Sequence, residues 1–287
     1  MQIVTDSGTD LSPAELAALN IRQLPLKLSI SGKTYLSGVN LQPEEFYNLI
    51  ESTEDMPVTS VPSPGDFIEI YQDLVKKDPE ILSIHISSGL SGTYNAARMA
   101  STMVPGADVT LVDTLNLSAG SGWQVVAAAK AAMAGWNKER ILDMVHKIRQ
   151  ATHTIYTLPD LKYLIAGGRI SHLKGLLASM LGIKPLIGVD PVTGKYTEMG
   201  KSRSFFKAIE AIPQTIAKQH APGSELRVQV GHAGNPSGAE RLKEAMNQVF
   251  KCEWLPDISI GPALGAHTGR GLVGVIYTAK SALPAMP

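Results

Sequence analysis

The chain has 287 residues, with 26 acidic and 26 basic side chains and a single cysteine, Cys252. A hydrophobic core stops growing at roughly 250–300 residues, so this length predicts two domains with a cleft between them. The balanced charge argues against nucleic acid or an anionic membrane surface as a partner, and one cysteine excludes an internal disulfide. No export signal and no apolar run of roughly 20 residues stand out. We therefore expect a cytoplasmic protein without stable membrane insertion.

The first half of the chain alternates short apolar runs with helical patterns. Its expected strands cover residues 3–5, a strand-pair region at 21–29, and residues 81–86 and 109–112. One expected helix begins at Ser12, and three others cover residues 43–51, 65–76 and 121–134. This order predicts an α/β fold with a mostly parallel sheet flanked by helices, in which ligands bind at the carboxyl ends of the strands.

The second half follows a different pattern. It starts after a helix at 138–150, which ends the first half. The expected elements are a strand at 153–158, a short helix ending at 167–168, and a hairpin of 183–189 with 195–199. They continue with a helix at 204–219, a strand at 226–230, a helix at 237–248, strands at 254–260 and 272–277, and a glycine-rich loop at 261–271. A hairpin mixed with βα units predicts an α+β domain. We place the N-terminal α/β domain at 1–155 and the C-terminal α+β domain at 156–287.

The most informative segment is residues 84–94, where an apolar run ends in a turn rich in serine and glycine that opens a helix. The first N–H groups of a helix have no intrahelical partner and carry the positive end of its dipole, so hydroxyls beside them can hold a carboxylate or phosphate. Ser and Thr also cap helices whatever the function. Four hydroxyls exceed what capping requires, and they are Ser87, Ser88, Ser91 and Thr93, with Gly92 between the last two.

Other polar turns are candidates to meet this one. Thr59 and Ser60 lie in an extended segment held by prolines, where rigid geometry suits ligand recognition, although a Ser/Pro loop also serves as a cap. Arg169 follows a glycine pair and Arg203 stands at a helix start; both can bind carboxylate or phosphate, and either can equally be a solvated surface charge. His267 lies in the glycine-rich loop and is the best histidine candidate.

Several common catalytic and metal motifs do not fit. Residues 188–195 have the wrong spacing for a phosphate-binding loop and read as a hairpin turn, and residues 89–93 have Thr93 where a nucleophile elbow has its second glycine. No glycine triplet matches the dinucleotide fingerprint, and the histidines show no ligand spacing with one another. We therefore expect neither a metal nor a cofactor.

Six segments, in order along the chain, are typical of one known family. They are Val4-Thr5-Asp6-Ser7, Thr59-Ser60 with Pro62-Ser63, Ser87 to Tyr94, Val112-Asp113-Thr114, Gly167 to Ser171, and Gly261 to His267. Through them the chain resembles the DegV family of fatty-acid-binding proteins over essentially its whole length. The resemblance implies two α/β domains, with a long-chain fatty acid in an apolar tunnel and its carboxyl group at the domain boundary. It also implies a partner, a separate fatty acid kinase that converts the bound acid to an acyl phosphate for phospholipid synthesis, so that the chain itself is a carrier rather than an enzyme.

The resemblance also assigns roles to individual positions. Thr59 and Ser91 match the hydroxyls that contact the carboxyl group, with Ser60, Gly92 and Thr93 nearby, and Arg169, Arg203 and His267 match the positive groups around the head group or its phosphate. Arg270 departs from the pattern because the family usually has proline there, and Val61 departs where a polar residue such as Gln is common.

Two alternatives stay open at the level of sequence. A serine esterase or acyltransferase would use Ser91 as nucleophile, Asp113 as orienting acid and His267 as base, an order seen in one hydrolase fold, although the elbow glycine is missing. A lipid-sensing regulatory module, in which the acid only fills the structure, is the other.

Overall fold

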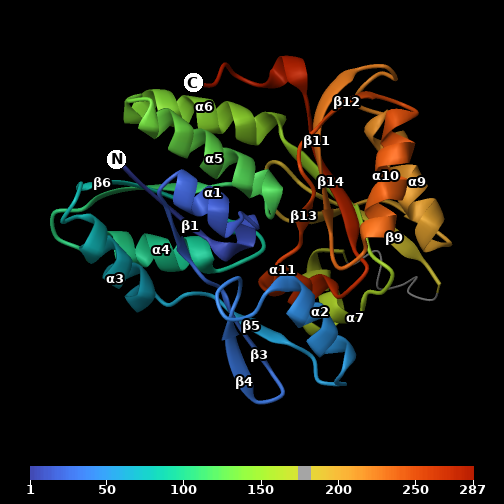
Figure 1. The fold of residues 1–287 in the computed structure, drawn as a ribbon, viewed down its shortest axis with the longest axis horizontal. Coiled ribbons are helices and arrows are strands. Elements are labelled where there is room, and N and C mark those ends of the chain that lie inside the picture. The colour runs from blue at the N-terminus through green and yellow to red at the C-terminus, as the bar shows by residue number, and fades with distance from the viewer. Residues whose placement is uncertain (174–181) are drawn as a thin grey trace.

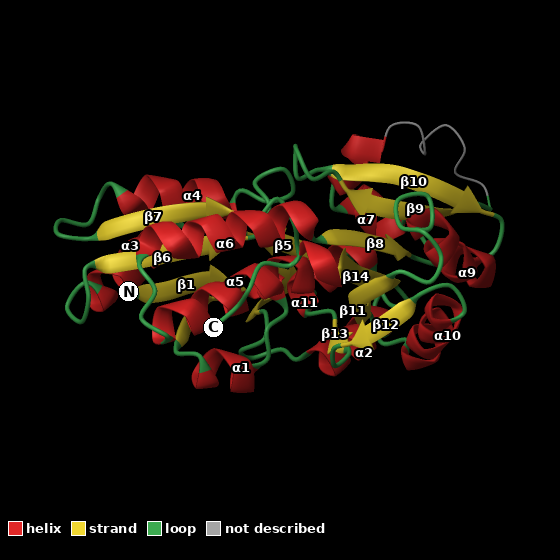
Figure 2. Cartoon of the chain, turned by 90° about the horizontal axis from the view of Figure 1, so that it is seen from above, coloured by secondary structure: helices red, strands yellow, loops and turns green. Residues whose placement is uncertain are grey.

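The computed structural model describes residues 1–173 and 182–287, which form two main sheets and a small third sheet (Figure 1). Seen from the second direction, the two main sheets lie side by side, with α5, β5 and α11 at the junction between them (Figure 2). No helix among the described residues is long and apolar enough to span a membrane.

The N-terminal sheet is parallel throughout, in the order β2-β1-β6-β7. Its strands are β1 (Gln2–Asp6), β2 (Ile21–Leu24), β6 (Glu80–His85) and β7 (Asp108–Asp113). Both faces are covered: α1 (Pro13–Ala18), α5 (Ala119–Met133) and α6 (Lys138–Ala151) pack on one, and α3 (Pro64–Leu74) and α4 (Thr93–Ser101) pack on the other. This is the expected α/β arrangement, and the two central strands, β1 and β6, are almost entirely buried because helices cover both of their faces.

A small antiparallel sheet extends from this domain towards the C-terminal one. It consists of β3 (Lys27–Ile30), β4 (Lys33–Leu36) and β5 (Val58–Ser60), in the order β4-β3-β5, and α2 (Pro43–Glu51) lies in its connection. Its apolar side chains share one core cluster with residues from the C-terminal half. Tyr47 on α2 donates a hydrogen bond to the Ile260 carbonyl over 2.8 Å, which ties the two halves together.

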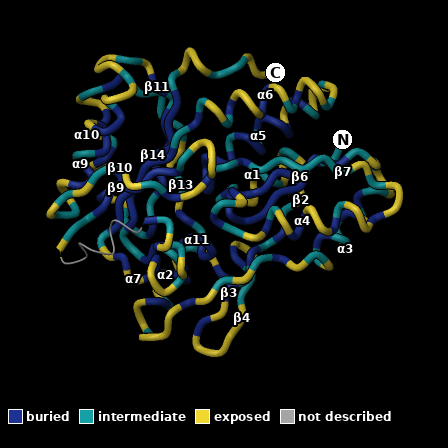
Figure 3. The backbone as a smooth tube through the Cα atoms, turned by 180° about the vertical axis from the view of Figure 1, so that it is seen from behind, coloured by how far each residue is buried: buried dark blue, intermediate teal, exposed yellow. Residues whose placement is uncertain are grey.

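The C-terminal sheet is mixed, in the order β10-β9-β8-β14-β11-β12, with β13 also paired to β11. Its strands are β8 (His153–Thr157), β9 (Lys184–Val189), β10 (Tyr196–Ser202), β11 (Glu225–His232), β12 (Lys251–Trp254), β13 (Ile258–Ser259) and β14 (Val273–Ala279). One face packs on α9 (Phe205–Ile216) and α10 (Pro236–Asn247), and the other turns towards α7 (Lys162–Ala166) and α11 (Pro262–Thr268). Figure 3 shows that the strands of both main sheets are largely buried and that the exposed residues lie mainly on the outer helices and loops.

Two expectations of the sequence need correction here, and one boundary needs comment. The glycine-rich segment 261–271 is not a loop, because Pro262 starts a helix in its first turn and buried Ala263 and Leu264 hold it in the core. The expected strand 254–260 is broken, since the chain leaves β12 at Trp254 and pairs again only at β13. The expected domain boundary between residues 155 and 156 falls inside β8, which belongs to the C-terminal sheet.

Candidate functional site

Five of the predicted site residues, the four described next and Ser60 of β5, line a small cavity between the domains. Thr59 comes from β5, Ser91 from the turn before α4, Arg169 from the start of the 3₁₀ helix η2 (Arg169–Leu173), and His267 from α11. We call this space, of about 40 Å³, the inner cavity. It is lined by Leu26, Thr59, Ser60, Val61, Ile86, Leu90, Ser91, Leu117, Arg169, Tyr196, Ala263, Leu264 and His267.

Thr59 and His267 form the contact that closes the site across the two halves of the chain. The Thr59 hydroxyl lies 2.8 Å from His267 Nε2. The ring fits because residue 167 is glycine: a Cβ there would stand 2.1 Å from His267 Nδ1. The glycine pair before Arg169 thus has a packing reason as well as a conformational one.

Burial and, to a smaller extent, the nearby Arg169 charge together lower the pKa of His267 to about 4. The imidazole is therefore neutral near pH 7 and carries one ring hydrogen. Among the described residues, its buried Nδ1 has no hydrogen-bond partner. A neutral ring beside Thr59 can donate to, or accept from, a ligand without placing a second buried charge next to Arg169.

The serine-rich turn divides into structural and cavity-lining hydroxyls. Ser87 is buried and donates to the Gly194 carbonyl of the β9–β10 turn over 2.8 Å, so it joins the two domains. Ser91 lines the inner cavity, with its Oγ 2.8 Å from Thr93 Oγ1 and accepting from the Thr93 N–H over 3.3 Å. Gly92 is the N-cap residue of α4 and supplies no side-chain cap, which leaves the Ser91 hydroxyl to serve the helix start.

Arg169 stands at the outer end of the inner cavity. Its Nη1 donates to the Gly167 carbonyl over 2.6 Å, and a weaker contact of 3.5 Å joins its Nε to the Leu90 carbonyl. A second, more open space of about 390 Å³, which we call the outer cavity, shares Leu90, Ser91 and Arg169 with the inner one and is also lined by His172 and Gly92. The head of a ligand at Ser91 would thus face solvent beside a cation.

The inner end of the site is apolar. A third space of about 40 Å³, the apolar cavity, shares Leu117 and Leu264 with the inner cavity. It continues between α5, α11 and the C-terminal sheet, against side chains such as Leu272, Val275 and Ile276. The three spaces therefore run from solvent past hydroxyls, a histidine and an arginine into an apolar interior.

The remaining predicted residues take different places. Ser60 lines the inner cavity, and Thr93 is buried behind Ser91. Arg203 is exposed between β10 and α9 and, among the described residues, lines neither the inner nor the outer cavity. Arg270 pairs with Glu51 on α2 and also reaches Asn48, so its side chain is engaged in a link between the two halves of the chain.

The hydrogen bonds of the esterase alternative are not those observed. His267 Nε2 faces Thr59 rather than Ser91. The Asp113 carboxylate accepts from the N–H groups of Ser88 and Leu115, each over 3.1 Å. Its role in the described structure is to hold the serine-rich turn against the end of β7. Within the described ranges, no group of three or more His, Cys, Asp or Glu side chains is placed to hold a metal ion.

Some residues that shape the site carried no signal in the sequence. Leu117 and Leu264 connect the two inner spaces, yet each belongs to a segment where an apolar residue is ordinary. Tyr196 lines the inner cavity from β10, and its place depends on the hairpin folding back over the site. Only the pairing of distant segments brings these side chains together.

The fold and the site define a two-domain α/β protein with an enclosed site at the domain boundary, polar at its outer end and apolar at its inner end. The family model of the DegV proteins, a family described as uncharacterised, matches residues 1–280. A DegV domain-containing protein of Staphylococcus aureus is 37% identical over 279 residues, which is 97% of this chain and 98% of that protein. The chain therefore belongs to the DegV family.

Solved structures agree with this assignment. A fatty-acid-binding DegV family protein from Thermus thermophilus has a TM-score of 0.86 at 28% identity, covering 97% of this chain and 99% of the other. DegV of Bacillus subtilis, described as a fatty acid binding protein, has a TM-score of 0.87 at 27% identity, with the same coverage. Both confirm the expected α/β fold.

Proposed function

We propose that this protein is a carrier that holds a long-chain fatty acid at the domain boundary and presents its carboxylate to a fatty acid kinase. The observation that carries the proposal is a row of three neighbouring cavities with shared lining residues, which leads from the outer cavity, past Thr59, Ser91, Arg169 and His267, to the apolar cavity. Relatives with the same fold are described as fatty-acid-binding proteins, which supports the ligand class.

The chemistry of the inner cavity suits a carboxylate. The Thr59 and Ser91 hydroxyls can each turn a hydrogen towards it, and the neutral His267 can donate through its one ring N–H. Arg169 supplies the opposite charge nearby, and charge-assisted hydrogen bonds are roughly twice as strong as neutral ones. The acyl chain then contributes about 0.8 kcal/mol for each methylene that leaves water, so the tail supplies most of the affinity.

The enclosed spaces are smaller than the ligand. The inner and apolar cavities each measure about 40 Å³, whereas pockets for ligands of such size have roughly 300–1,000 Å³. Binding therefore moves side chains along the path or opens the domains slightly. The Thr59–His267 contact is the first one to be exchanged, because a carboxylate would take the hydroxyl and the ring N–H that now face each other.

Presentation to a kinase requires that one carboxylate oxygen remain accessible. In the proposed reaction this oxygen attacks the terminal phosphorus of a nucleotide held by the kinase, the bond to the nucleoside diphosphate breaks, and an acyl phosphate forms. The outer cavity beside Ser91 and Arg169 is the opening through which that oxygen is reached. The product bears more charge than the acid, and Arg169 is placed to balance it, with Arg203 as a second candidate on the exposed surface.

The binding half of the proposal is tested by native mass spectrometry of the purified protein, followed by extraction and identification of the bound lipid. We expect one fatty acid per chain. Thr59→Ala and Ser91→Ala should each weaken oleic acid binding about tenfold, the cost of losing one hydrogen bond to a charged group. Ser88→Ala is the matched control, since Ser88 lines only the outer cavity and should bind as the wild type does. An empty protein that also refuses added oleic acid contradicts the proposal.

The kinase half is tested by mixing acid-loaded protein with a purified fatty acid kinase and ATP and measuring acyl phosphate. Arg169→Ala should lower the rate of phosphorylation more than it lowers acid binding. If Arg169→Ala binds much less acid while the kinase phosphorylates the remaining bound acid at the normal rate, Arg169 serves binding alone and its proposed role at the phosphate is refuted.

A further inference from the structure

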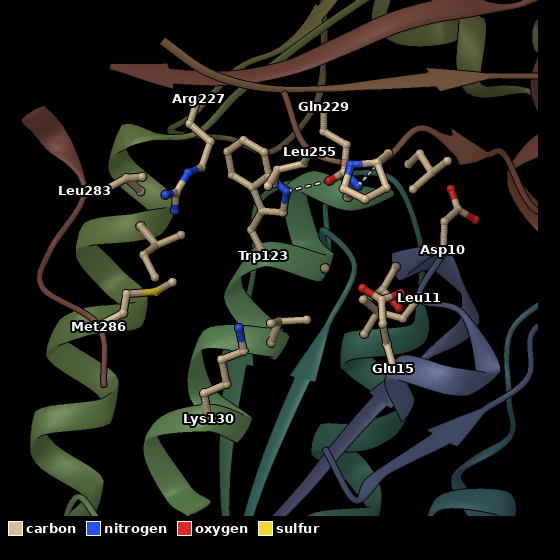
Figure 4. A pocket seen from close by; sticks show the side chains of 17 residues that line it. Asp10, Leu11, Glu15, Trp123, Lys130, Arg227, Gln229, Leu255, Leu283 and Met286 are labelled. Carbon is tan, nitrogen blue, oxygen red and sulfur yellow. Dashed lines mark hydrogen bonds between the residues drawn. The ribbon is translucent and has the colours of Figure 1, made fainter. Parts of the chain in front are cut away.

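A larger pocket lies beyond the inner end of the proposed path, and we call it the interdomain pocket (Figure 4). It has a volume of about 230 Å³ and is lined from both domains and from the C-terminal segment. Its walls are largely apolar, with Leu11 and Val126 on one side and Leu255 and Ile258 on the other. Four charged residues also line it. Glu15 and Lys130 are exposed and can keep their heads in water at its outer edge, Arg227 pairs with Glu253, and Asp10 accepts a hydrogen bond from Ser118.

The interdomain pocket and the apolar cavity are neighbours along the domain boundary. On β11, Gln229 lines the pocket and Gly231 lines the apolar cavity, and residues two apart on a strand face the same side. The same step separates Ile258 from Ile260. On the opposite wall the two spaces are lined by consecutive residues: Ser118 lines the apolar cavity, and Ala119 lines the interdomain pocket.

A hydrogen-bonded pair of side chains lies near the boundary between the apolar cavity and the interdomain pocket. Trp123 on α5 donates from Nε1 to Gln229 Oε1 on β11 over 2.6 Å, so the bond crosses from one domain to the other, as the dashed line in Figure 4 shows. Gln229 Nε2 donates in turn to the Pro256 carbonyl over 2.8 Å, and Gln229 is only 9% exposed. Both polar ends of the amide are thus satisfied, which makes the pair a rigid wall.

Such a wall matters to an apolar chain end. Neither side chain lines the apolar cavity, but Gln229 lies two residues from Gly231 on the same face of β11, and Gly231 does line it. A methyl group that passes this position into the pocket would have to break a buried hydrogen bond and leave Gln229 or Trp123 unpaired, which is costly. Behind the wall is apolar surface that could bury further methylenes. We propose that the Trp123–Gln229 pair limits the length of the bound acyl chain, and that the interdomain pocket is the space a longer chain occupies once the pair is removed.

This inference rests on the proposed function, and the experiment separates the two. The measured quantity is the ratio of the dissociation constants for behenic and palmitic acids, two saturated acids of which behenic is the longer. Trp123→Ala and Gln229→Ala each remove one half of the wall, so either one serves if the other fails to fold. We expect both to improve the relative affinity for behenic acid by about tenfold or more, because each additional buried methylene is worth about fourfold.

Two further variants sharpen the test. Trp136→Ala makes the same substitution in a tryptophan that packs on the same core cluster but does not line the pocket, and it should keep the wild-type ratio. Trp123→Ala combined with Val126→Phe refills the pocket behind the opened wall and should cancel the gain. A gain that disappears on refilling cannot come from general loosening of the fold.

The possible outcomes are distinct. If wild-type protein binds palmitic acid but the ratio is unchanged in both wall variants, the inference is overturned and the proposed function stands. If the gain persists after Val126→Phe, the longer chain takes another route and the pocket is not its site. If wild-type protein binds neither acid, the proposed function and the inference both fall.

Discussion

We expect Gly167→Ala to displace the His267 ring while leaving the other residues of the site in place. The added Cβ would stand 2.1 Å from His267 Nδ1, whereas ordinary contact begins at 3.4 Å, so the ring must withdraw by about 1 Å or more. A displacement of that size alters the 2.8 Å contact between Thr59 and His267 Nε2, because a hydrogen bond tolerates only a few tenths of an ångström. The backbone itself accepts alanine, because φ at Gly167 is −75°. We expect affinity for palmitic acid to fall about tenfold, and stability by about 1–3 kcal/mol from overpacking.

Isothermal titration with palmitic acid and urea unfolding measure the two effects. Gly65→Ala in α3 is the control: Gly65 lines none of the three cavities, and the added Cβ meets only Ser63 Oγ, at 3.5 Å. It should bind as the wild type does. A folded Gly167→Ala protein with palmitic acid affinity within about threefold of the wild type would refute the role given to His267.

Three further predictions concern stability. Burial raises the pKa of Asp10 to about 7, so between about pH 4 and 7 the folded protein binds more protons than the unfolded chain and loses stability as pH rises. Asp10→Asn should remove up to about 4 kcal/mol of this loss. Urea unfolding at pH 5 and 8 measures it, and the same change in free energy of unfolding in the variant and the wild type would contradict the prediction. His267, with its pKa lowered to about 4 by burial, acts in the opposite sense, because the unfolded chain binds more protons between about pH 4 and 6.5 and stability rises with pH there. His267→Gln should remove up to about 3 kcal/mol of that rise, and a pH profile identical to the wild type would contradict it. Ser87→Ala loses the hydrogen bond to Gly194 and should cost about 1–2 kcal/mol at every pH, as measured by thermal unfolding; a cost confined to one end of the pH range would point to another cause.

Local patterns predicted most of the secondary structure because the periodicities of strands and helices survive into the fold. The helix at 43–51 matches α2, and the hairpin expected from 183–199 is the β9–β10 pair. The prediction for segment 261–271 was wrong because its glycines, considered without the rest of the fold, disfavour a helix. In the structure Gly265 lies against Phe46 and Tyr47, where a Cβ would come within 2.7 Å of each, so close packing with α2 offsets its low helix propensity.

The sequence also predicted only part of the candidate site. The polar motifs named Thr59, Ser91, Arg169 and His267, and the structure brings these four to one cavity. Arg203, taken from the same resemblance, stands apart on the surface. Its role depends on what binds that surface, which a pattern within one chain does not encode.

The sequence by itself determined the class of fold, the order of its elements and the polar residues at the ends of its strands, because these depend on short-range periodicity and turn chemistry. Only the tertiary structure decided which polar residues meet, that Ser87 joins the domains through Gly194, and that Trp123 and Gln229 form a hydrogen bond between the domains. The physical reason is distance along the chain: Thr59 and His267 are separated by 208 positions, and their contact exists only because the small sheet of the first half packs on a helix of the second.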